Sequence, residues 1–299
     1  MTFGLVSACP SPDTDKHSHA PVAVVLRDLG LGDLLVAVPA LRLLRRALPA
    51  HRIVLVAATA LAPVVERIEA VDVHVSSFRP YEVGNCSHRA VDVAVNLHGR
   101  GPQSHARLEA LAPRRRIGHA APGWAGPEWT EDPTRSERRR WCDLLAATGL
   151  VGAAEARAGA DDVRLPGADS PARAAKAPFA ASDAAKGALA APSPGPVVVH
   201  PGAAYGAKRW PAERFATCAA ALRDRGHEVV VTGSDAERAL TAAVVAAAGL
   251  PPDADLGGRT DLAGVLDLVA GAALVLAGDT GISHVATAFA TPSITLFGP

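Results

Sequence analysis

The chain has 299 residues, of which 49% are hydrophobic, and its 30 Lys and Arg residues balance its 30 Asp and Glu residues. This length allows one large or two medium domains with substantial cores, and the zero net charge argues against a broad cationic surface for nucleic acid. No apolar run in the sequence approaches the ~20 residues of a membrane span. The four cysteines stand far apart without zinc-ligand spacing. We therefore expect a reduced, cytoplasmic protein with at most peripheral contact at the inner face of the membrane.

The first half of the chain alternates short apolar runs with longer amphipathic ones. Residues 1–20 show neither pattern, and we expect them to form a disordered leader. The pattern then predicts strands at 22–26, 52–57, 71–75 and 91–96, and helices at 34–48, 61–68, 103–111 and 137–147. Because strands alternate with helices, residues 21–150 are predicted to form a domain whose parallel sheet is covered on both faces.

The composition changes in the middle of the chain. Residues 151–195 are rich in Ala, Pro, Gly and Ser, which predicts a linker with one marginal helix. The alternation then resumes, with strands predicted at 197–200, 228–232, 274–277 and 293–297, and helices at 211–225, 236–248, 262–270 and 282–289. Two such domains, the second over residues 196–299, predict a cleft between the carboxyl ends of two sheets, where ligands of open α/β folds bind.

The first candidate site follows the first predicted strand, in the stretch RDLGLGDLL. Gly30 and Gly32 resemble a dinucleotide-binding loop, but Leu35 stands where the third glycine would fall, so this signature is incomplete. The alternative is a tight turn that presents Asp33 at the mouth of the next helix. In the simplest interpretation Asp33 is only the N-cap of that helix.

The second candidate site is HPGAAYGAKRWP, between a strand and a helix. A glycine-containing loop at a helix N-terminus offers backbone N–H groups to an anion. Lys208 adds a point charge suited to phosphate. The chain has only four lysines and many arginines, which makes the presence of lysine at this position notable.

Two further strand ends carry acids. In TGSDAER, Ser234 or Asp235 is a candidate helix cap, and Asp235 or Glu237 is a candidate for holding ribose hydroxyls. The sequence does not decide between these two acids.

In GDTGISH, Asp279 is predicted to end a strand and to contact sugar hydroxyls, while Thr280 and Gly281 begin a helix whose N–H groups suit a diphosphate. His284 would lie one turn into that helix, on the face of Thr280. Taken alone, His284 is better explained as a packed histidine than as a catalyst.

The remaining polar stretches carry weaker signals. We expect His98 and Arg100, in NLHGRGPQSH, to contact an acceptor, and an ordinary polar loop explains them equally well. The basic runs 114–116 and 138–140 are candidate anion sites, although solvated faces explain them better. Two Asp-x-Asp patterns, at 13–15 and 253–255, are interpreted as chance matches to metal–diphosphate motifs.

Taken together, GDLLVAVPALRLLRRALP, HPGAAYGAKRWP, GRTDL and GDTGISHVATAFATPSITLFGP resemble glycosyltransferase family 9, the heptosyltransferase-like enzymes. The resemblance extends from Val22 to the last residue. It implies the GT-B fold, with two Rossmann-like doubly wound domains facing a central cleft. The N-terminal domain would bind the acceptor and the C-terminal domain the nucleotide-sugar donor.

The resemblance also implies an activity: inverting, metal-independent transfer of a sugar from a nucleotide diphosphate donor, expected to be ADP-heptose, with no further cofactor. It places the catalytic base at Asp33 and the phosphate-binding lysine at Lys208. It assigns the donor motif to Asp279, Thr280, Gly281 and His284, and a further donor-binding acid to Asp235 or Glu237. The acceptor stays open among the lipopolysaccharide core, another cell-envelope glycan or lipid-linked glycan, and a small molecule.

Three alternatives remain. An NAD-dependent dehydrogenase would explain the first glycine loop, although its fingerprint is incomplete. A nucleotide-sugar 2-epimerase has the same architecture, but we find no convincing set of its carboxylates and histidines. The family usually continues past the Phe-Gly-Pro segment at which this sequence stops, and this motivates a non-catalytic sugar-nucleotide-binding protein.

Overall fold

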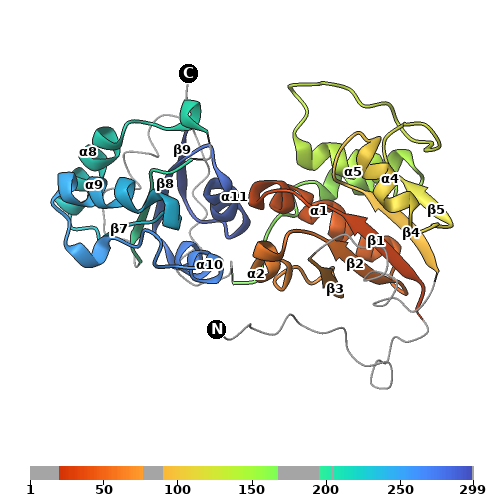
Figure 1. Cartoon of the computed structure of the whole chain (residues 1–299), viewed down its shortest axis with the longest axis horizontal. Helices are drawn as coiled ribbons and strands as arrows, with labels where there is room; N and C mark the ends of the chain where they lie inside the picture. The colour runs from red at the N-terminus through yellow and green to blue at the C-terminus, as the bar shows by residue number, and fades with distance from the viewer. Residues whose placement is uncertain (1–19, 77–89, 168–194, 204, 298–299) are drawn as a thin grey trace. The chain divides into compact units, whose positions relative to one another are not determined.

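The chain forms two compact units, residues 1–162 and 163–299, in a computed structural model that describes residues 20–76, 90–167, 195–203 and 205–297 (Figure 1). The expected leader, apart from Ala20, lies outside the described residues, as does most of the expected linker. None of the helices in the described parts of the chain is long and apolar enough to cross a membrane.

The first unit is built on a five-stranded parallel sheet in the order β3-β2-β1-β4-β5. Its strands are β1 (Val22–Leu26), β2 (Arg52–Val56), β3 (Val73–Val75), β4 (Val91–Asn96) and β5 (Arg115–Ile117). Every residue of the central strand β1 is buried, as expected for a parallel strand with both faces covered. From β1 the chain winds one way to β3 and then returns to β4, so the winding direction reverses between β1 and β4.

Helices surround this sheet: α1 (Leu31–Ala47), η1 (Thr59–Leu61), α2 (Ala62–Val65), α4 (Gln103–Glu109), α5 (Glu137–Ala147) and α6 (Ala153–Gly159). Helices α1, α5 and α6 pack against one another. Helix α6 lies within the stretch expected to be a linker. Helix α1 continues through Pro39, which is buried with its apolar neighbours. Their packing compensates for the backbone hydrogen bond that proline cannot make.

Strand β5 was not predicted, because two of its three residues are arginines that we interpreted as part of a basic run. Both are engaged at the edge of the sheet: Arg116 pairs with Glu109 of α4, and Arg115 donates to the carbonyl of Thr148. The second basic run is also engaged, since Arg139 pairs with Asp143.

The second unit has a four-stranded parallel sheet in the order β7-β6-β8-β9. Its strands are β6 (Val197–His200), β7 (Val229–Val231), β8 (Leu274–Gly278) and β9 (Ser293–Leu296). The chain passes from β6 to β7 on one side and then to β8 on the other. The winding direction therefore reverses between β6 and β8.

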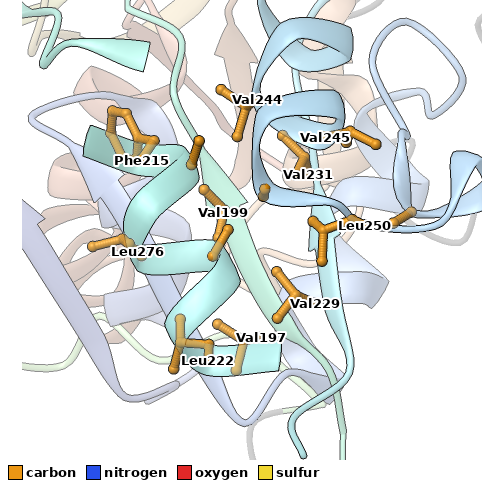
Figure 2. Packing of buried hydrophobic residues seen from close by; sticks show 14 residues of the cluster. Val197, Val199, Phe215, Leu222, Val229, Val231, Val244, Val245, Leu250 and Leu276 are labelled. Atoms are coloured by element: carbon orange, nitrogen blue, oxygen red, sulfur yellow. The ribbon is translucent and has the colours of Figure 1, made fainter. Parts of the chain in front are cut away.

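Two helix pairs accompany this sheet: α8 (Ala212–Arg223) with α9 (Arg238–Ala248), and α10 (Leu262–Gly271) with α11 (Gly281–Ala288). Short 3-10 turns lie within the connections that lead into α8, α9 and α10: η3 (Gly206–Lys208), η4 (Asp235–Glu237) and η5 (Pro252–Ala254). Figure 2 shows Phe215 and Leu222 of α8 and Val244 of α9 in one cluster with four valines of β6 and β7, which are Val197, Val199, Val229 and Val231. This core fixes the strand ends from which the candidate site residues project.

Candidate functional site

In the first unit, the candidate residues follow the two strands between which the sheet reverses its winding direction. Leu26, the last residue of β1, lies beside Asn96, the last residue of β4. The residues that follow these strands therefore lie at one edge of the sheet, which is the usual ligand position in open α/β folds.

Asp33 is the third residue of α1 rather than its N-cap, which is Gly30. Its Oδ2 accepts a hydrogen bond from the Gly30 N–H at 3.1 Å, so the side chain reaches back to the start of the helix as in a capping box. The expected N-cap position is wrong by one helical turn, because the helix begins at Leu31. The Asp33 side chain is 42% exposed, which leaves it accessible to a reacting group.

Arg27 was not predicted as a site residue, yet its buried side chain contacts several segments of this region. Its side chain is fully buried, and its Nη2 lies 3.6 Å from Oδ1 of Asp33. Nη2 also donates to Oε1 of Glu137 at 2.8 Å, and the guanidinium lies 5.0 Å from the ring centroid of Trp141. The sequence did contain a signal for this role, because Arg27 directly follows a wholly apolar strand. A charge that is buried in such a position must find buried partners.

His98 follows β4 and is half-buried at the same edge of the sheet. Its backbone N–H donates to the side-chain oxygen of Asn96 at 3.0 Å. Burial lowers the pKa of the His98 imidazole, and the charge of Arg107 adds to this effect, while Asp28 and Asp33 oppose it. A neutral imidazole can both donate and accept a hydrogen bond, and among the described residues its Nδ1 has no hydrogen-bond partner.

Arg100 lies two residues further along the same loop and is exposed. The neighbouring Arg107 contacts Asp28 at 3.1 Å. The edge of the first sheet thus combines an accessible carboxylate, a neutral imidazole and several arginines.

The second unit repeats the arrangement where its own winding direction reverses. His200, at the end of β6, pairs with Ala277 of β8. The loop after β6 carries Lys208 and the residue after β8 is Asp279. The two meet, with Lys208 Nζ donating to Asp279 Oδ2 at 2.7 Å.

This ion pair is accessible to solvent, since the side chain of Lys208 is 47% exposed and that of Asp279 37%. The hydrogen bond from Lys208 to Asp279, together with the carboxylate charge, raises the pKa of the Lys208 amine. Because water screens a pair of this kind, it contributes little to stability and can exchange for a ligand.

Helix α11 begins beside the pair. Thr280 is its N-cap and Gly281 its first residue, so the first N–H groups of the helix lack partners within it. The Oγ1 atom of Thr280 is buried without a hydrogen-bond partner among the described residues. His284 lies one turn into α11 and is partly buried.

Glu237 and Asp235, which the sequence could not separate, occupy different environments. The Glu237 carboxylate accepts hydrogen bonds from the N–H and hydroxyl groups of Ser234 at 2.8 and 2.7 Å. It covers Gly202 so closely that a Cβ atom on that glycine would lie 2.1 Å from Oε1. The side chain of Asp235 is 83% exposed and pairs with Arg238.

The pKa of Glu237 is affected by opposing factors. Burial acts to raise it, but the hydrogen bonds from Ser234 and the charges of His200 and Arg209 outweigh burial, so the pKa lies below its usual value. Glu237 is therefore an ionised acceptor beside the loop that follows β6.

The structure describes no group of three or more His, Cys, Asp or Glu side chains that could hold a metal ion. Asp255 instead accepts a hydrogen bond from the Gly257 N–H at 3.0 Å, while the pattern at 13–15 lies outside the described residues.

The sequence model of "Glycosyltransferase family 9 (heptosyltransferase)" matches residues 140–299, more than half of the chain. The chain belongs to glycosyltransferase family 9. The lipopolysaccharide heptosyltransferase 2 of Escherichia coli is 36% identical over 103 residues, which are 33% of this family 9 chain and 30% of that relative. The lipopolysaccharide heptosyltransferase 1 of Pseudomonas aeruginosa is 38% identical over 99 residues, 33% of this chain and 27% of that relative. These matches thus span less than a third of the curated relatives' length.

Solved structures confirm the fold of this family 9 member. A glycosyltransferase family 9 protein from Veillonella parvula superimposes with a TM-score of 0.70 at 21% identity, over 92% of this chain and 80% of that one. The E. coli ADP-heptose heptosyltransferase II gives 0.68 at 22% identity, over 93% and 85%. The E. coli heptosyltransferase WaaC with ADP gives 0.66 at 20% identity, over 93% and 88%. The fold is of the GT-B type, with two Rossmann-like units.

Proposed function

We propose that this family 9 protein is an inverting, metal-independent glycosyltransferase that moves a heptose from ADP-heptose to a hydroxyl of the lipopolysaccharide core or a related cell-envelope glycan. The observation that carries the proposal is the Lys208–Asp279 pair beside the start of α11, where the second sheet reverses its winding direction. The printed names of the relatives, lipopolysaccharide heptosyltransferases, support the choice of sugar and acceptor.

The second unit would bind the donor. A diphosphate would replace Asp279 as the partner of Lys208 and would accept hydrogen bonds from the N–H groups at the start of α11. Asp279, thereby released, would accept hydrogen bonds from the sugar hydroxyls, and Thr280, as the N-cap of α11, would line the same site. His284, one turn into α11, would also line this donor site.

We assign the donor-binding acid to Glu237 rather than Asp235. Glu237 is directed toward the loop after β6 and is held there as an ionised acceptor, whereas Asp235 is directed to solvent and pairs with Arg238. A ribose hydroxyl would donate to Glu237, as is usual for acids after such strands.

The first unit would supply the base. As the acceptor oxygen forms its bond to the anomeric carbon, its proton passes to Asp33. The bond from that carbon to the diphosphate oxygen breaks, and its electron pair leaves with ADP. Lys208 and the α11 N–H groups would stabilise the charge that develops on ADP.

His98 and Arg100 would bind the acceptor, because they lie at the same edge of the first sheet as Asp33. A neutral His98 could orient a sugar hydroxyl, and the exposed Arg100 could contact an anionic group of a core glycan. We place the protein in the cytoplasm, at most peripherally bound to the inner face of the membrane.

The test is calorimetric titration of the purified protein with ADP, GDP, UDP and NAD, repeated with Lys208→Ala. We expect ADP to bind best, and the variant to bind it ~10-fold or more weakly, because a hydrogen bond to a charged group is lost. ADP release from ADP-heptose with a heptose-free lipopolysaccharide core should then require Asp33. Tight NAD binding that does not depend on Lys208 would contradict the proposal and favour a dehydrogenase.

A further inference from the structure

The buried guanidinium of Arg27 has no role in the transfer described so far. It donates from Nε to the main-chain oxygen of Asp33 at 2.8 Å and from Nη1 to the main-chain oxygen of Leu97. Its Nη2 donates to Glu137 at 2.8 Å. One side chain thereby joins the start of α1, the end of β4 and the start of α5.

A buried charge of this kind requires a reason beyond stability. Desolvation of an ion pair commonly cancels its Coulombic gain, and apolar side chains of similar volume often stabilise a core equally well. Two of the contacts of Arg27, one to the main chain and one to the side chain, are instead made with Asp33, the proposed base.

We propose that Arg27, held in place by Glu137, is a positioning residue that fixes the carboxylate of Asp33 for proton transfer. This inference rests on the proposed function, in which Asp33 accepts the proton of the acceptor hydroxyl.

The carboxylate is held from two sides. The Gly30 N–H binds Oδ2, and Arg27 Nη2 faces Oδ1 at 3.6 Å. Arg27 Nε also binds the main-chain oxygen of the same aspartate. Because backbone and side chain are both held, little torsional freedom remains, and a base fixed in this way approaches the substrate without further ordering.

Glu137 holds the arginine in turn. Its Oε1 accepts hydrogen bonds from Arg27 Nη2 and from the Trp141 indole N–H at 3.2 Å. The guanidinium carbon also lies over the ring of Trp141, so two side chains of α5 contact the buried charge. The other nearby acid, Asp28, pairs with Arg107.

The experiment compares Arg27→Lys with Arg45→Lys. Lysine keeps the charge but loses the planar fork that reaches three acceptors at once. Arg45 is a matched control, since it also donates to main-chain oxygens, those of His51 and Ala70, and pairs with Asp72. These partners lie near the amino ends of β2 and β3, away from Asp33.

Two properties are measured for each variant: kcat and KM for ADP-heptose with the heptose-free core, and amide hydrogen exchange of peptides covering residues 27–36 without substrate. In Arg27→Lys we expect kcat to fall ~10- to 100-fold, as for a misplaced catalytic group. The donor KM should stay within about twofold and the loop should exchange faster. Arg45→Lys should change neither kcat nor the exchange of this loop.

If Arg27→Lys does not fold, Glu137→Gln provides the second test, because it removes the charge that fixes the guanidinium while keeping an oxygen acceptor. Loop exchange equal to that of the wild type, or faster exchange with unchanged kcat, would overturn the inference. A wild type without turnover would contradict the proposed function, while loop exchange would still decide whether Arg27 orders Asp33.

Discussion

At the scale of single residues, the second unit gives different surroundings to two acids that stand only two positions apart, Asp235 and Glu237. Glu237 lies over Gly202 and is held by Ser234, whereas Asp235 is exposed and pairs with Arg238. Because only Glu237 lies against the loop after β6, replacing each acid by its isosteric amide should distinguish their proposed roles.

We predict that Glu237→Gln weakens ADP binding by ~10-fold or more, because an ionised acceptor contributes more to a hydrogen bond than a neutral amide does. Asp235→Asn, the matched control, should bind ADP within about twofold of the wild type. Calorimetric titration measures both constants. A larger loss in Asp235→Asn than in Glu237→Gln would reverse our assignment.

At the scale of elements, α4 depends on two glycines for its packing. Its His105 is buried, with its ring 4.2 Å from that of Trp124. A Cβ atom on Gly101 would lie 2.0 Å from His105 Nδ1, and one on Gly118 would lie 2.7 Å from Nε2. The helix can approach the sheet closely because both flanking positions lack a side chain.

We predict that Gly101→Ala lowers the Tm clearly more than Gly123→Ala does. Both glycines have the same left-handed backbone, with φ of +80° and +79°, but only Gly101 faces another group, since nothing lies within 4 Å of a Cβ atom on Gly123. The cost of placing a side chain at a left-handed φ is therefore similar at the two positions, and the steric clash is not. Thermal unfolding measures both Tm values. Equal losses in the two variants would contradict the prediction, because they would show that the contact between the added methyl group and His105 is relieved at no cost in stability.

At the scale of the whole molecule, buried imidazoles couple the stability of the chain to pH. Burial lowers the pKa values of His98, His105 and His119 in the first unit and of His200 in the second. A histidine of this kind is protonated more readily in the unfolded chain, so its contribution to stability is present above the unfolded value of about 6.5 and is lost as the pH falls below it.

We therefore predict that the Tm falls between pH 7.5 and pH 5.5. His105→Phe keeps a ring against Trp124 but cannot be protonated, so its Tm should fall less over the same interval. Calorimetric scans at the two pH values compare the slopes. An identical slope in wild type and variant would exclude His105 as a source of the pH dependence.

Much of this arrangement follows from local sequence. The bounds of β1, β4, β6 and α5 were predicted without error, because largely apolar short runs and an amphipathic helical pattern determine them locally. The loops that carry Lys208, Asp279, Thr280 and Gly281 were also predicted to follow strands. Parallel strands direct their carboxyl ends to one edge of the sheet, which is why these loops were considered together as a site.

Tertiary structure decided what depends on distant partners. Strand β5 forms because its three residues pair with β4 at the edge of the sheet. No local pattern distinguished these residues from a basic run. Arg27 and Glu137 are 110 positions apart, and Glu237 is distinguished from Asp235 only by the loop that it covers. The sequence by itself determined the two α/β units and the loops that carry the candidate residues, because these depend on periodicity. The hydrogen bonds and charges around each candidate side chain were decided by the tertiary structure, because long-range packing alone brings their partners together.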